Sequence, residues 1–493
     1  MQRVLIANRG EIAVRVARAC HEVGLAAVAV YSEADRGAPH TLAADAAVSI
    51  GGAPARESYL NVEALLAAAR LSGADAVHPG YGFLAESAAF ARAVEGAGLV
   101  WIGPPPAAIA TMGDKLAARA AVEAARVPCV PGTELAPGDA RAAARHAARL
   151  GYPVLVKAAA GGGGKGMRTV GSEAELAEAL AAAGREAEAA FGDGRVYLEK
   201  LLVRPRHVEV QVLGDRHGTL VHLGERECSI QRRHQKIIEE TPSPAVTARV
   251  RAELVGAALA AARAVGYVNA GTVEFLLDAD GRFYFLEMNT RVQVEHPITE
   301  LVTGVDIVAA QLRIATGAPL GFTQADVVPR GHAIEARLYA EDPAASFFPS
   351  AGPILALREP GGPGIRVDSG VATGSVVPLD YDPLLGKISA WGADRASAAA
   401  RLGAALRETA VLGPTTNLAF LQDVIAHPAF LRGETHTGFL AEHFPAWRDR
   451  ADDALAAALA AAVAVSRPVA SAGDTPAAAP TPWETLGAWR LGR

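Results

Sequence analysis

Short apolar runs alternate with amphipathic segments over the first 114 residues of the chain. The apolar runs have the length of buried strands: VLIAN, AAVAVYS, AVHPGYG and LVWIG. The segments between them place apolar residues at helical spacing: EIAVRVARACHEV, NVEALLAAARLSG and ESAAFARAVEGAG. This alternation predicts a parallel, Rossmann-like α/β sheet. The first strand-to-helix turn, ANRGEI, lacks the GxGxxG pattern of a dinucleotide site, which argues against a nicotinamide cofactor.

The pattern changes between residues 115 and 330. YPVLVKA is typical of a buried strand that ends at Lys157, and the glycine-rich AAGGGGKGMRTV follows it and leads into a second β-like segment. HVEVQVLG alternates in polarity, so we expect His207, Glu209 and Gln211 to share one face of a strand.

The rest of the chain reads as two further segments. Residues 331–446 mix the strand-like HAIEARLYA, GIRVDSG and KISAW with two helices, which predicts an α+β part. Residues 447–493 are rich in alanine and then in proline, which predicts a helix and a linker. A chain of 493 residues exceeds one ordinary domain, so we expect several packed units, with boundaries near 114, 330 and 446.

The composition is that of a globular protein, with 51% hydrophobic and 20% charged residues. A net charge of -6 argues against a nucleic-acid coat or a membrane-surface helix, since both need basic excess. Charges interrupt the N-terminal MQRVLIANRGEIAVRV, and no apolar run is long enough to span a bilayer. The three cysteines are far apart, which disfavours a disulfide framework or a zinc site. We therefore expect a cytoplasmic protein with neither nucleic-acid nor membrane partners.

Lysine is scarce, and most of it is clustered. The chain has 47 lysines and arginines together, and the lysines among them are Lys115, Lys157, Lys165, Lys200, Lys236 and Lys387. An ammonium is a compact point charge for phosphate and is not interchangeable with a guanidinium. A bias in the base composition of the coding DNA explains why lysine is scarce, but the clustering of lysines between residues 115 and 236 indicates sites that need lysine.

The glycine-rich segment offers a cradle for phosphate oxygens. Residues 161–166, with Lys165 among them, supply free backbone N–H groups and one ammonium. The segment is not a P-loop, because Gly166 follows Lys165 where Ser or Thr is required. A flexible hairpin tip explains the glycines equally well, so this segment alone does not decide between the two.

A hairpin predicted in GTVEFLLDADGRFYFLEMN brings two carboxylates together. A two-residue turn at Asp280 and Gly281 places Glu274 directly opposite Glu287, with Cβ atoms roughly 4.5–5.5 Å apart. A four-residue loop from Asp278 to Gly281 would make the pair diagonal on the same face. Facing carboxylates repel unless a cation lies between them, and Mg²⁺ prefers such hard oxygen ligands.

The chain after Glu287 continues the polar pattern. Glu287, Asn289, Arg291, Gln293 and Glu295 follow at two-residue spacing, so in an extended chain all would share one face. Arginine can grip a small oxyanion, and a carboxylate beside it can take its proton. The basic QRRHQK segment, by contrast, is by itself typical of a solvated strand.

Together these segments resemble biotin carboxylase, a member of the ATP-grasp superfamily. The matching motifs run in order from residue 1 to about 446: ANRGEIA, HPGYGFLAE, MGDK, GGGGKGM, QRRHQK, EMNTRVQVEHPITE, GHAIEAR and YDPLLGK. The resemblance implies a Rossmann-like N-terminal domain (1–114), an ATP-grasp domain (115–330) with a mobile glycine-loop lid at about 130–203, and an α+β C-terminal domain (331–446).

The resemblance also implies site residues. Those at the ATP positions are Lys115, Lys157, Gly163, Gly164, Met167, Glu199, Lys200, Leu202, His207, Gln231, His234, Glu274 and Glu287. Those at the metal positions are Glu274, Glu287 and Asn289. Those at the bicarbonate positions are Lys236, Arg291, Gln293, Val294 and Glu295. Those at the biotin positions are Arg337 and Tyr81. Lys236, Arg291, Glu295 and Arg337 make the expected catalytic group, with Glu295 as the base.

The implied activity is ATP- and Mg²⁺- (or Mn²⁺-) dependent carboxylation of biotin by bicarbonate through carboxyphosphate. This is the first half-reaction of an acetyl-CoA or other acyl-CoA carboxylase, with biotin as a substrate held on a carrier. The implied partners are a biotin carboxyl carrier protein or domain and a carboxyltransferase subunit, which selects the acyl-CoA. A homodimer is also implied, with Arg18, Glu22 and Arg366 at its contact.

In this family a biotinylated lysine has methionine neighbours, as in AMKM. No lysine of the chain has one, so we expect no biotin on this polypeptide. The segment PWETLGAWRL resembles the region after the carboxylase in α chains of the methylcrotonoyl-CoA type.

Two rival interpretations remain. Another ATP-grasp ligase, such as a purine-pathway carboxylase or a carbamoyl-phosphate synthase half, would share the glycine loop and the paired glutamates, but not both QRRHQK and NTRVQVEHP. A nucleotide-binding scaffold without catalysis is expected to have lost some of the charged residues of the site, whereas here they are present.

Overall fold

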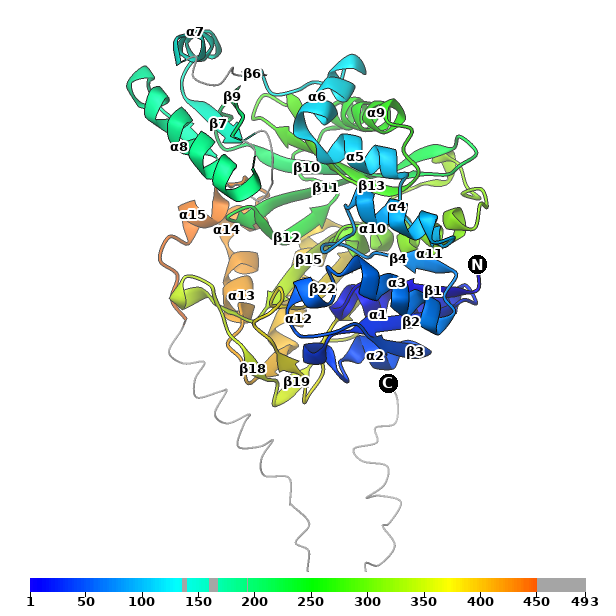
Figure 1. Cartoon of the computed structure of the whole chain (residues 1–493). Coiled ribbons are helices and arrows are strands. Elements are labelled where there is room, and N and C mark those ends of the chain that lie inside the picture. The colour runs from blue at the N-terminus through cyan, green and yellow to red at the C-terminus, as the bar shows by residue number, and fades with distance from the viewer. Residues whose placement is uncertain (135–139, 159–166, 193, 450–493) are drawn as a thin grey trace, which may run out of the picture. The chain divides into compact units, whose positions relative to one another are not determined.

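The computed structural model describes residues 1–134, 140–158, 167–192 and 194–449, drawn in colour in Figure 1. Its N-terminal part is a parallel sheet in the order β3-β2-β1-β4-β5. The strands are β1 (Arg3–Ile6), β2 (Ala26–Tyr31), β3 (Ala46–Ser49), β4 (Ala76–His78) and β5 (Val100–Trp101). The helices around them are α1 (Gly10–Glu22), α2 (Pro39–Ala43), α3 (Val62–Ser72), α4 (Ala88–Gly96) and α5 (Pro106–Gly113).

The predicted parallel α/β sheet is thus confirmed, with one strand more than the sequence indicated. The additional β3 lies at the sheet edge with mostly exposed side chains, so it lacks the apolar run of a buried strand. At the start of α1, Gly10 has φ +63°, which glycine tolerates without strain. The side-chain amide of Asn8 donates to the carbonyl oxygens of Pro79 and Tyr81, and so joins the end of β1 to the loop after β4.

Helix α6 (Lys115–Ala124) leads into a smaller sheet in the order β6-β9-β7-β8. Its strands are β6 (Gly132–Glu134), β7 (Val154–Ala158), β8 (Arg168–Val170) and β9 (Val196–Lys200). Helices α7 (Ala140–Leu150) and α8 (Glu173–Phe191) pack on it, and Figure 1 shows these elements as a lobe above the rest of the described chain. The β-like segment predicted after the glycine-rich stretch is β8, whereas residues 159–166 lie outside the described part.

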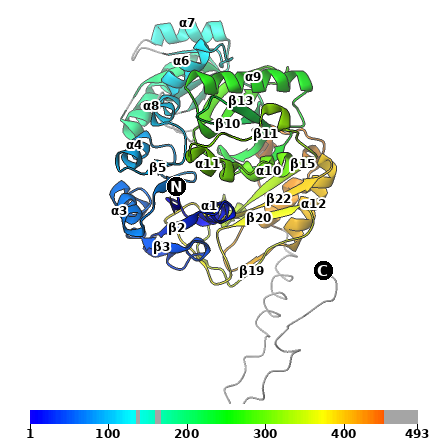
Figure 2. The ribbon, with the colours of Figure 1, turned by 90° about the vertical axis from the view of Figure 1, so that its right-hand side faces the viewer.

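A large antiparallel sheet in the order β14-β13-β10-β11-β12-β15-β22-β20 carries most of the polar residues of interest. Its strands are β10 (Arg206–Gly214), β11 (Leu220–Arg232), β12 (Gln235–Thr241), β13 (Asn269–Leu277), β14 (Phe283–Asn289), β15 (His332–Tyr339), β20 (Ile365–Ser369) and β22 (Leu384–Gly392). The associated helices are α9 (Ala248–Ala264), α10 (His296–Thr303), α11 (Ile307–Ala315), α12 (Arg395–Glu408), α13 (Leu418–Ala426), α14 (Pro428–Leu431) and α15 (Phe439–His443). Figure 2 gives a second view of these strands, turned by 90° from that of Figure 1.

Short ribbons complete the part near residues 341–412. They pair β16 (Glu341–Asp342) with β17 (Phe348–Pro349), β18 (Gly352–Pro353) with β21 (Val376–Val377), and β19 (Ala356–Arg358) with β23 (Ala410–Leu412). The large sheet continues through the boundary predicted at residue 330, because β12 pairs directly with β15. The division into domains therefore stays a prediction from the sequence.

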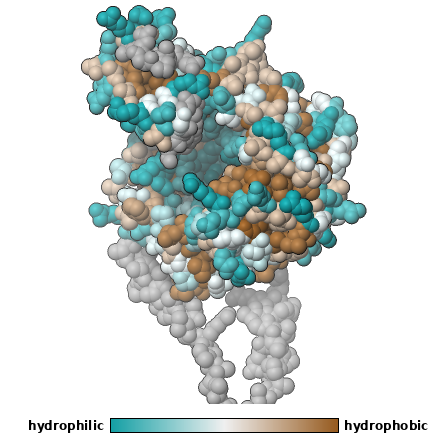
Figure 3. Space-filling view, viewed as in Figure 1, coloured by the Kyte–Doolittle hydropathy of each residue, from teal (hydrophilic) through white to brown (hydrophobic). Residues whose placement is uncertain are grey.

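Alternation along β10 decides which residues face the site. Val208, Val210 and Val212 pack in a core cluster with residues of α9, such as Leu254. His207, Glu209 and Gln211 consequently project to the opposite face, as predicted. Figure 3 shows that the molecule is hollowed below the lobe, and that mainly hydrophilic residues line the hollow. The described helices include none long and apolar enough to cross a bilayer.

Candidate active site

Three glutamates lie in a row across neighbouring strands of the large sheet. Glu209 on β10 pairs with Glu274 on β13, and Glu274 pairs with Glu287 on β14. Glu209 and Glu274 are buried, whereas Glu287 is exposed. Such a row of carboxylates is unfavourable without cations, and the neighbouring elements supply them.

The facing pair of Glu274 and Glu287 is confirmed, but the predicted two-residue turn is wrong. The Asp278 N–H donates to the Arg282 carbonyl oxygen at 2.8 Å, which closes a longer loop. That loop pairs Leu277 with Phe283 and would put Glu274 opposite the residue before Glu287. A bulge next to Glu274 shifts the register by one residue and restores the pair.

Lys236 on β12 is surrounded by carboxylates from three elements. Its Nζ lies 2.5 Å from Glu209 Oε2, 2.8 Å from Glu274 Oε1 and 2.7 Å from Glu295 Oε1. Burial disfavours its charge, but the carboxylates outweigh burial and raise the pKa of Lys236 well above its ordinary value. The QRRHQK segment is therefore not a solvated strand, since its lysine is a fixed internal cation.

The extended stripe predicted from Glu287 to Glu295 is wrong as geometry. Strand β14 ends at Asn289, and the chain then turns so that Glu295 immediately precedes α10. The turn nevertheless directs the Gln293 amide to Glu274, with Nε2 2.7 Å from Oε1. Arg291 instead donates to Asn289 Oδ1 at 2.9 Å, and its Nε donates to Glu86, a residue that the sequence did not indicate.

Arg337 on β15 is a second cation against Glu295. Its Nη2 lies 3.0 Å from Glu295 Oε2, and its Nε lies 2.6 Å from Oε1 of Glu239, a buried residue on β12. Burial opposes ionisation of Glu295, but Lys236 and Arg337 outweigh it and hold its pKa below the ordinary value. Glu295 is thus ionised and able to accept a proton.

Tyr81 and the predicted dimer residues have other contacts. The Tyr81 hydroxyl donates to Glu11, and Glu11 pairs with the buried Lys387 at 3.1 Å. Arg18 lies 3.6 Å from Asp368, to which Arg366 is also bound. Glu22 lies 4.0 Å from Arg18 on α1, so α1 and β20 bring the three predicted dimer residues into one charged group.

The described residues of the predicted nucleotide set lie at the start of α6, on or beside the smaller sheet, on β10, β11, β13 and β14, and in the turn after β11. Lys157 Nζ is 2.5 Å from Glu199 Oε2, and Lys200 Nζ donates to the Gly151 carbonyl oxygen at 2.7 Å. Burial lowers the pKa of Lys115, and the charge of Glu287 opposes that effect. His207 Nε2 is 2.8 Å from Glu274 Oε2.

The other predicted nucleotide residues are placed as follows. Gln231 donates to the Cys228 carbonyl oxygen at 3.3 Å, and His234 has φ +69° in the turn between β11 and β12. Met167 and Leu202 are half-buried. Gly163 and Gly164 lie outside the described residues. The backbone carbonyl oxygen of Val294 accepts a hydrogen bond from Lys387 Nζ at 2.6 Å.

The predicted metal ligands fit a divalent cation with hard oxygen ligands. Glu274, Glu287 and Asn289 share one end of the β13–β14 pair and offer carboxylate and amide oxygens. The Glu287 side chain reaches solvent, but protein on its other sides weakens its hydration, and this desolvation, with the nearby charge of Glu274, raises the pKa of Glu287. A cation between the two carboxylates would relieve this repulsion, so the residues fit Mg²⁺.

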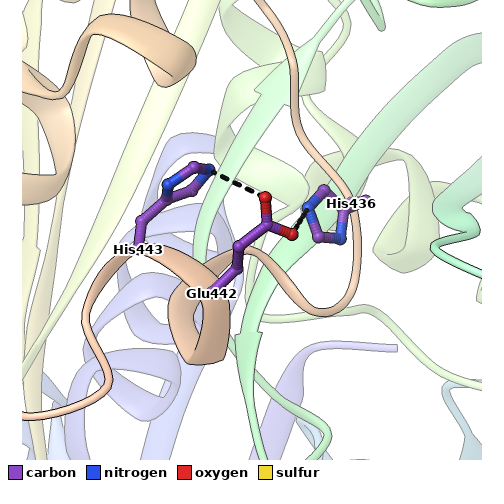
Figure 4. Close-up of side chains that lie close together, drawn as sticks. All are labelled: His436, Glu442 and His443. Atoms are coloured by element: carbon purple, nitrogen blue, oxygen red, sulfur yellow. Dashed lines mark ion pairs between the residues drawn. The ribbon is translucent and has the colours of Figure 1, made fainter.

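Another group of possible ligands lies at α15, where His436, Glu442 and His443 point toward one another (Figure 4). His436 Nε2 is 3.3 Å from Glu442 Oε2, and His443 Nε2 is 3.9 Å from Oε1. The Gly438 N–H donates to His436 Nδ1 at 3.1 Å, so the neutral ring carries its proton on Nε2. A protonated nitrogen has no lone pair for a metal ion, and we assign no metal site there.

The buried carboxyl group of Glu335 leads to a prediction about how stability depends on pH. Glu335 on β15 faces Glu239 on β12 and Ser389 on β22, and burial raises its pKa to about 8, with Lys387 in opposition and Glu239 in support. The folded state then keeps a proton that the unfolded chain loses above pH ~4.3. Stability should therefore fall as pH rises from about 4.3 to about 8.

Glu335→Gln should flatten this dependence, as measured by urea unfolding at about pH 5 and about pH 8. Ser389→Ala is the control, because it leaves the Glu335 carboxyl in place and should retain the slope. An unchanged slope in the Glu335→Gln variant would contradict the assignment.

Comparison with known proteins places this geometry in a family. The family described as "Biotin carboxylase, N-terminal domain" matches residues 1–109. "Carbamoyl-phosphate synthase L chain, ATP binding domain" matches residues 114–323, and "Biotin carboxylase C-terminal domain" matches residues 335–442. The carbamoyl-phosphate synthase likeness is thus confined to the central part and is flanked by two biotin carboxylase domains.

Whole proteins agree with these matches. The biotin carboxylase of Allochromatium vinosum is 52% identical over 441 residues, which cover 89% of this chain and 98% of that protein. A pyruvate carboxylase subunit of Methanothermobacter thermautotrophicus is 51% identical over 441 residues, 90% of each chain.

A solved structure agrees as well. The biotin carboxylase domain dimer of Hydrogenobacter thermophilus 2-oxoglutarate carboxylase, in complex with MgADP, ADP and bicarbonate, superposes with a TM-score of 0.87 at 44% identity. The superposition covers 91% of this chain and 99% of that one. With sequence, domain order and fold in agreement, the chain belongs to the biotin carboxylase family.

Proposed function

We propose that this chain uses ATP, Mg²⁺ and bicarbonate to carboxylate biotin held on a separate carrier. One observation carries the assignment: Lys236, with 11% of its side chain exposed, and the buried Arg337 meet at the carboxylate of Glu295. Two fixed cations around one ionised carboxylate make a site that can bind an oxyanion and remove its proton. The Hydrogenobacter thermophilus relative, whose complex contains MgADP and bicarbonate, supports the same chemistry.

Each residue then has a proposed role. Glu295 takes the proton of bicarbonate, while Lys236, Arg291 and Gln293 hold its oxygens. Bicarbonate then attacks the γ-phosphoryl group of ATP, which forms carboxyphosphate and releases ADP. Glu274, Glu287 and Asn289 would hold Mg²⁺, which would neutralise charge on the transferring phosphoryl group. Lys115, Lys157 and His207 add positive or polar groups around the phosphates.

The second step uses the other side of the same pocket. The carboxyphosphate formed in the first step yields CO₂ and phosphate, and phosphate removes the proton from the ureido nitrogen of biotin. That nitrogen then attacks CO₂ and forms carboxybiotin. Arg337 stabilises the ureido oxygen as it becomes negative, and Glu295 keeps the guanidinium in place. Closure of the lid that the family resemblance implies should keep water from hydrolysing carboxyphosphate.

Dependence on substrates tests the assignment. ADP release by the purified chain should require bicarbonate and should increase when free biotin is added, as measured by a coupled ADP assay. Another ATP-grasp ligase would release ADP without responding to biotin, and a scaffold would release none. A rate that is indifferent to biotin would therefore contradict the proposal.

Partners and assembly follow from the same proposal. The relatives include one subunit of a pyruvate carboxylase and a carboxylase domain dimer, which supports a carrier, a carboxyltransferase and a homodimer as partners of this chain. The charged group around Arg18, Glu22 and Arg366 is the proposed dimer contact. The acyl-CoA acceptor is selected by the carboxyltransferase, and a cytoplasmic location stays a prediction.

We expect the chain to carry no biotin of its own. No lysine has a methionine neighbour, and the structure shows Lys157 and Lys387 buried and Lys236 held by three carboxylates. A biotin ligase needs an exposed lysine, so a streptavidin blot of the chain made alongside an active ligase should be blank. A carrier protein in the same reaction is the positive control, and a labelled lysine in this chain would contradict the expectation.

A further inference from the structure

Arg226 on β11 is a guanidinium with no exposure to solvent. All five N–H donors of an arginine need partners in such a place, and here all five have one. The acceptors are Glu209 Oε1 (2.6 Å), Gln211 Oε1 (2.9 Å), Thr299 Oγ1 (2.9 Å), Gln293 Oε1 (2.8 Å) and Thr272 Oγ1 (3.3 Å). The sequence pattern does not single out Arg226, which lies in the segment ERECSIQ.

The contact with Gln293 fixes the direction of an amide. Arginine has no acceptor atom, so the Gln293 group facing Arg226 must be the carbonyl oxygen. The amide nitrogen consequently points the other way, and it donates to Glu274 Oε1 at 2.7 Å. The amide nitrogen of Gln293 thus lies beside the carboxylate that also holds Lys236, where an oxyanion needs donors.

The contact with Glu209 adjusts the charge of the same pocket. Lys236 lies among Glu209, Glu274 and Glu295, and Arg337 also contacts Glu295, so two positive charges face three negative ones. An anion would be repelled from such a group. Arg226 is bound to Glu209 on the oxygen that Lys236 does not use, so it neutralises one carboxylate from behind.

We infer that Arg226 is a positioning residue for bicarbonate binding. It turns the Gln293 amide toward the pocket, and by neutralising Glu209 it leaves Lys236 able to attract an anion. Arg226 acts through its contacts with Gln293 and Glu209 and is itself fully buried. The inference rests on the proposed function, because it assumes that bicarbonate binds at Lys236 and Gln293.

The experiment compares Arg226→Lys with Thr299→Val. Lysine keeps the charge but loses the fork that reaches Glu209 and Gln293 together. Valine at 299 removes one hydrogen bond of Arg226 but leaves both contacts with the pocket. Arg226→Lys should raise the KM for bicarbonate on the order of 10- to 100-fold, while the KM for ATP stays within about twofold. Thr299→Val should leave both constants within about twofold.

Combination with Gln293→Ala shows whether Arg226 acts through the amide. In free energy, the double variant Arg226→Lys/Gln293→Ala should change the KM for bicarbonate by less than the sum of the changes in the two single variants. Full additivity would overturn the inference. So would an unchanged KM for bicarbonate in folded Arg226→Lys, or an equal rise in the KM for ATP.

A further variant covers the case in which Arg226→Lys does not fold. Gln293→Glu keeps a partner for Arg226 but removes the N–H donors, so it should raise the KM for bicarbonate at least tenfold, a typical effect of losing a hydrogen bond to an anion. An unchanged KM there would overturn the inference. If the wild-type chain releases ADP without needing bicarbonate, the proposed function fails, and the inference fails with it.

Discussion

Replacing Glu287 by glutamine is expected to slow bicarbonate-dependent ADP release by a factor on the order of 10² or more. Glu287 is the exposed member of a facing carboxylate pair, and it is therefore free to reach a metal ion from the hollow. Glutamine keeps the size of the side chain but removes the charge that attracts Mg²⁺ and that must be present as the phosphoryl group transfers. The expected loss is in kcat and in the Mg²⁺ dependence, whereas stability should change little because the site is exposed.

Controls separate the metal site from a general charge effect. Glu253→Gln removes an exposed glutamate on α9 that pairs with Arg249, and it should leave the rate unchanged. Raising the Mg²⁺ or Mn²⁺ concentration should recover part of the rate of Glu287→Gln, as measured by initial rates over a metal titration. Near-normal activity of Glu287→Gln at low Mg²⁺ would rule out a metal ion at this hairpin.

Arg337→Ala should separate the two half-reactions. Carboxybiotin formation, measured with labelled bicarbonate, should fall on the order of 10²-fold or more, because the ureido oxygen loses its cation. Bicarbonate-dependent ADP release should fall less than about tenfold, because Lys236 still contacts Glu295. Equal losses in both assays would place Arg337 in folding or nucleotide binding.

Arg337 is paired with the buried Glu239, so a second variant is needed to separate a loss of stability from a loss of activity. Arg337→Ala leaves Glu239 without its ion pair inside the sheet, and such a stranded charge costs about 3–5 kcal/mol of stability. Adding Glu239→Gln removes the stranded charge, so the double variant should regain stability in urea unfolding. It should remain defective in carboxybiotin formation. A double variant that regains both would contradict the proposed contact between Arg337 and biotin.

The sequence by itself determined features that depend on local periodicity. Alternation along β10 placed His207 and Glu209 on one face, and the apolar runs of the first 114 residues predicted their parallel sheet. Motif order indicated the family and the identity of most residues that meet in the candidate site. The strand and helix features can be predicted from the sequence because side chains return to the same face every two residues in a strand and every 3.6 residues in a helix.

Register and chain direction were decided only by the tertiary structure. The loop after Leu277 is longer than the sequence suggested, and a bulge beside Glu274 happens to restore the predicted pair with Glu287. The stripe after Asn289 leaves its strand, yet Gln293 still reaches Glu274 through a turn. Bulges and turns change the register by single residues at a cost that depends on the packing around them.

The charged residues of the candidate site are brought together by pairing between strands that are far apart in the sequence. Arg226, Glu239 and Lys236 come from β11 and β12, and Arg337 comes from β15, which pairs with β12 only because the large sheet continues past residue 330. Nothing in the local pattern around Arg226 distinguishes it from a surface arginine. Its burial is favourable because Glu209, Gln211 and Gln293 converge on it from other segments, and such convergence is a property of the folded chain.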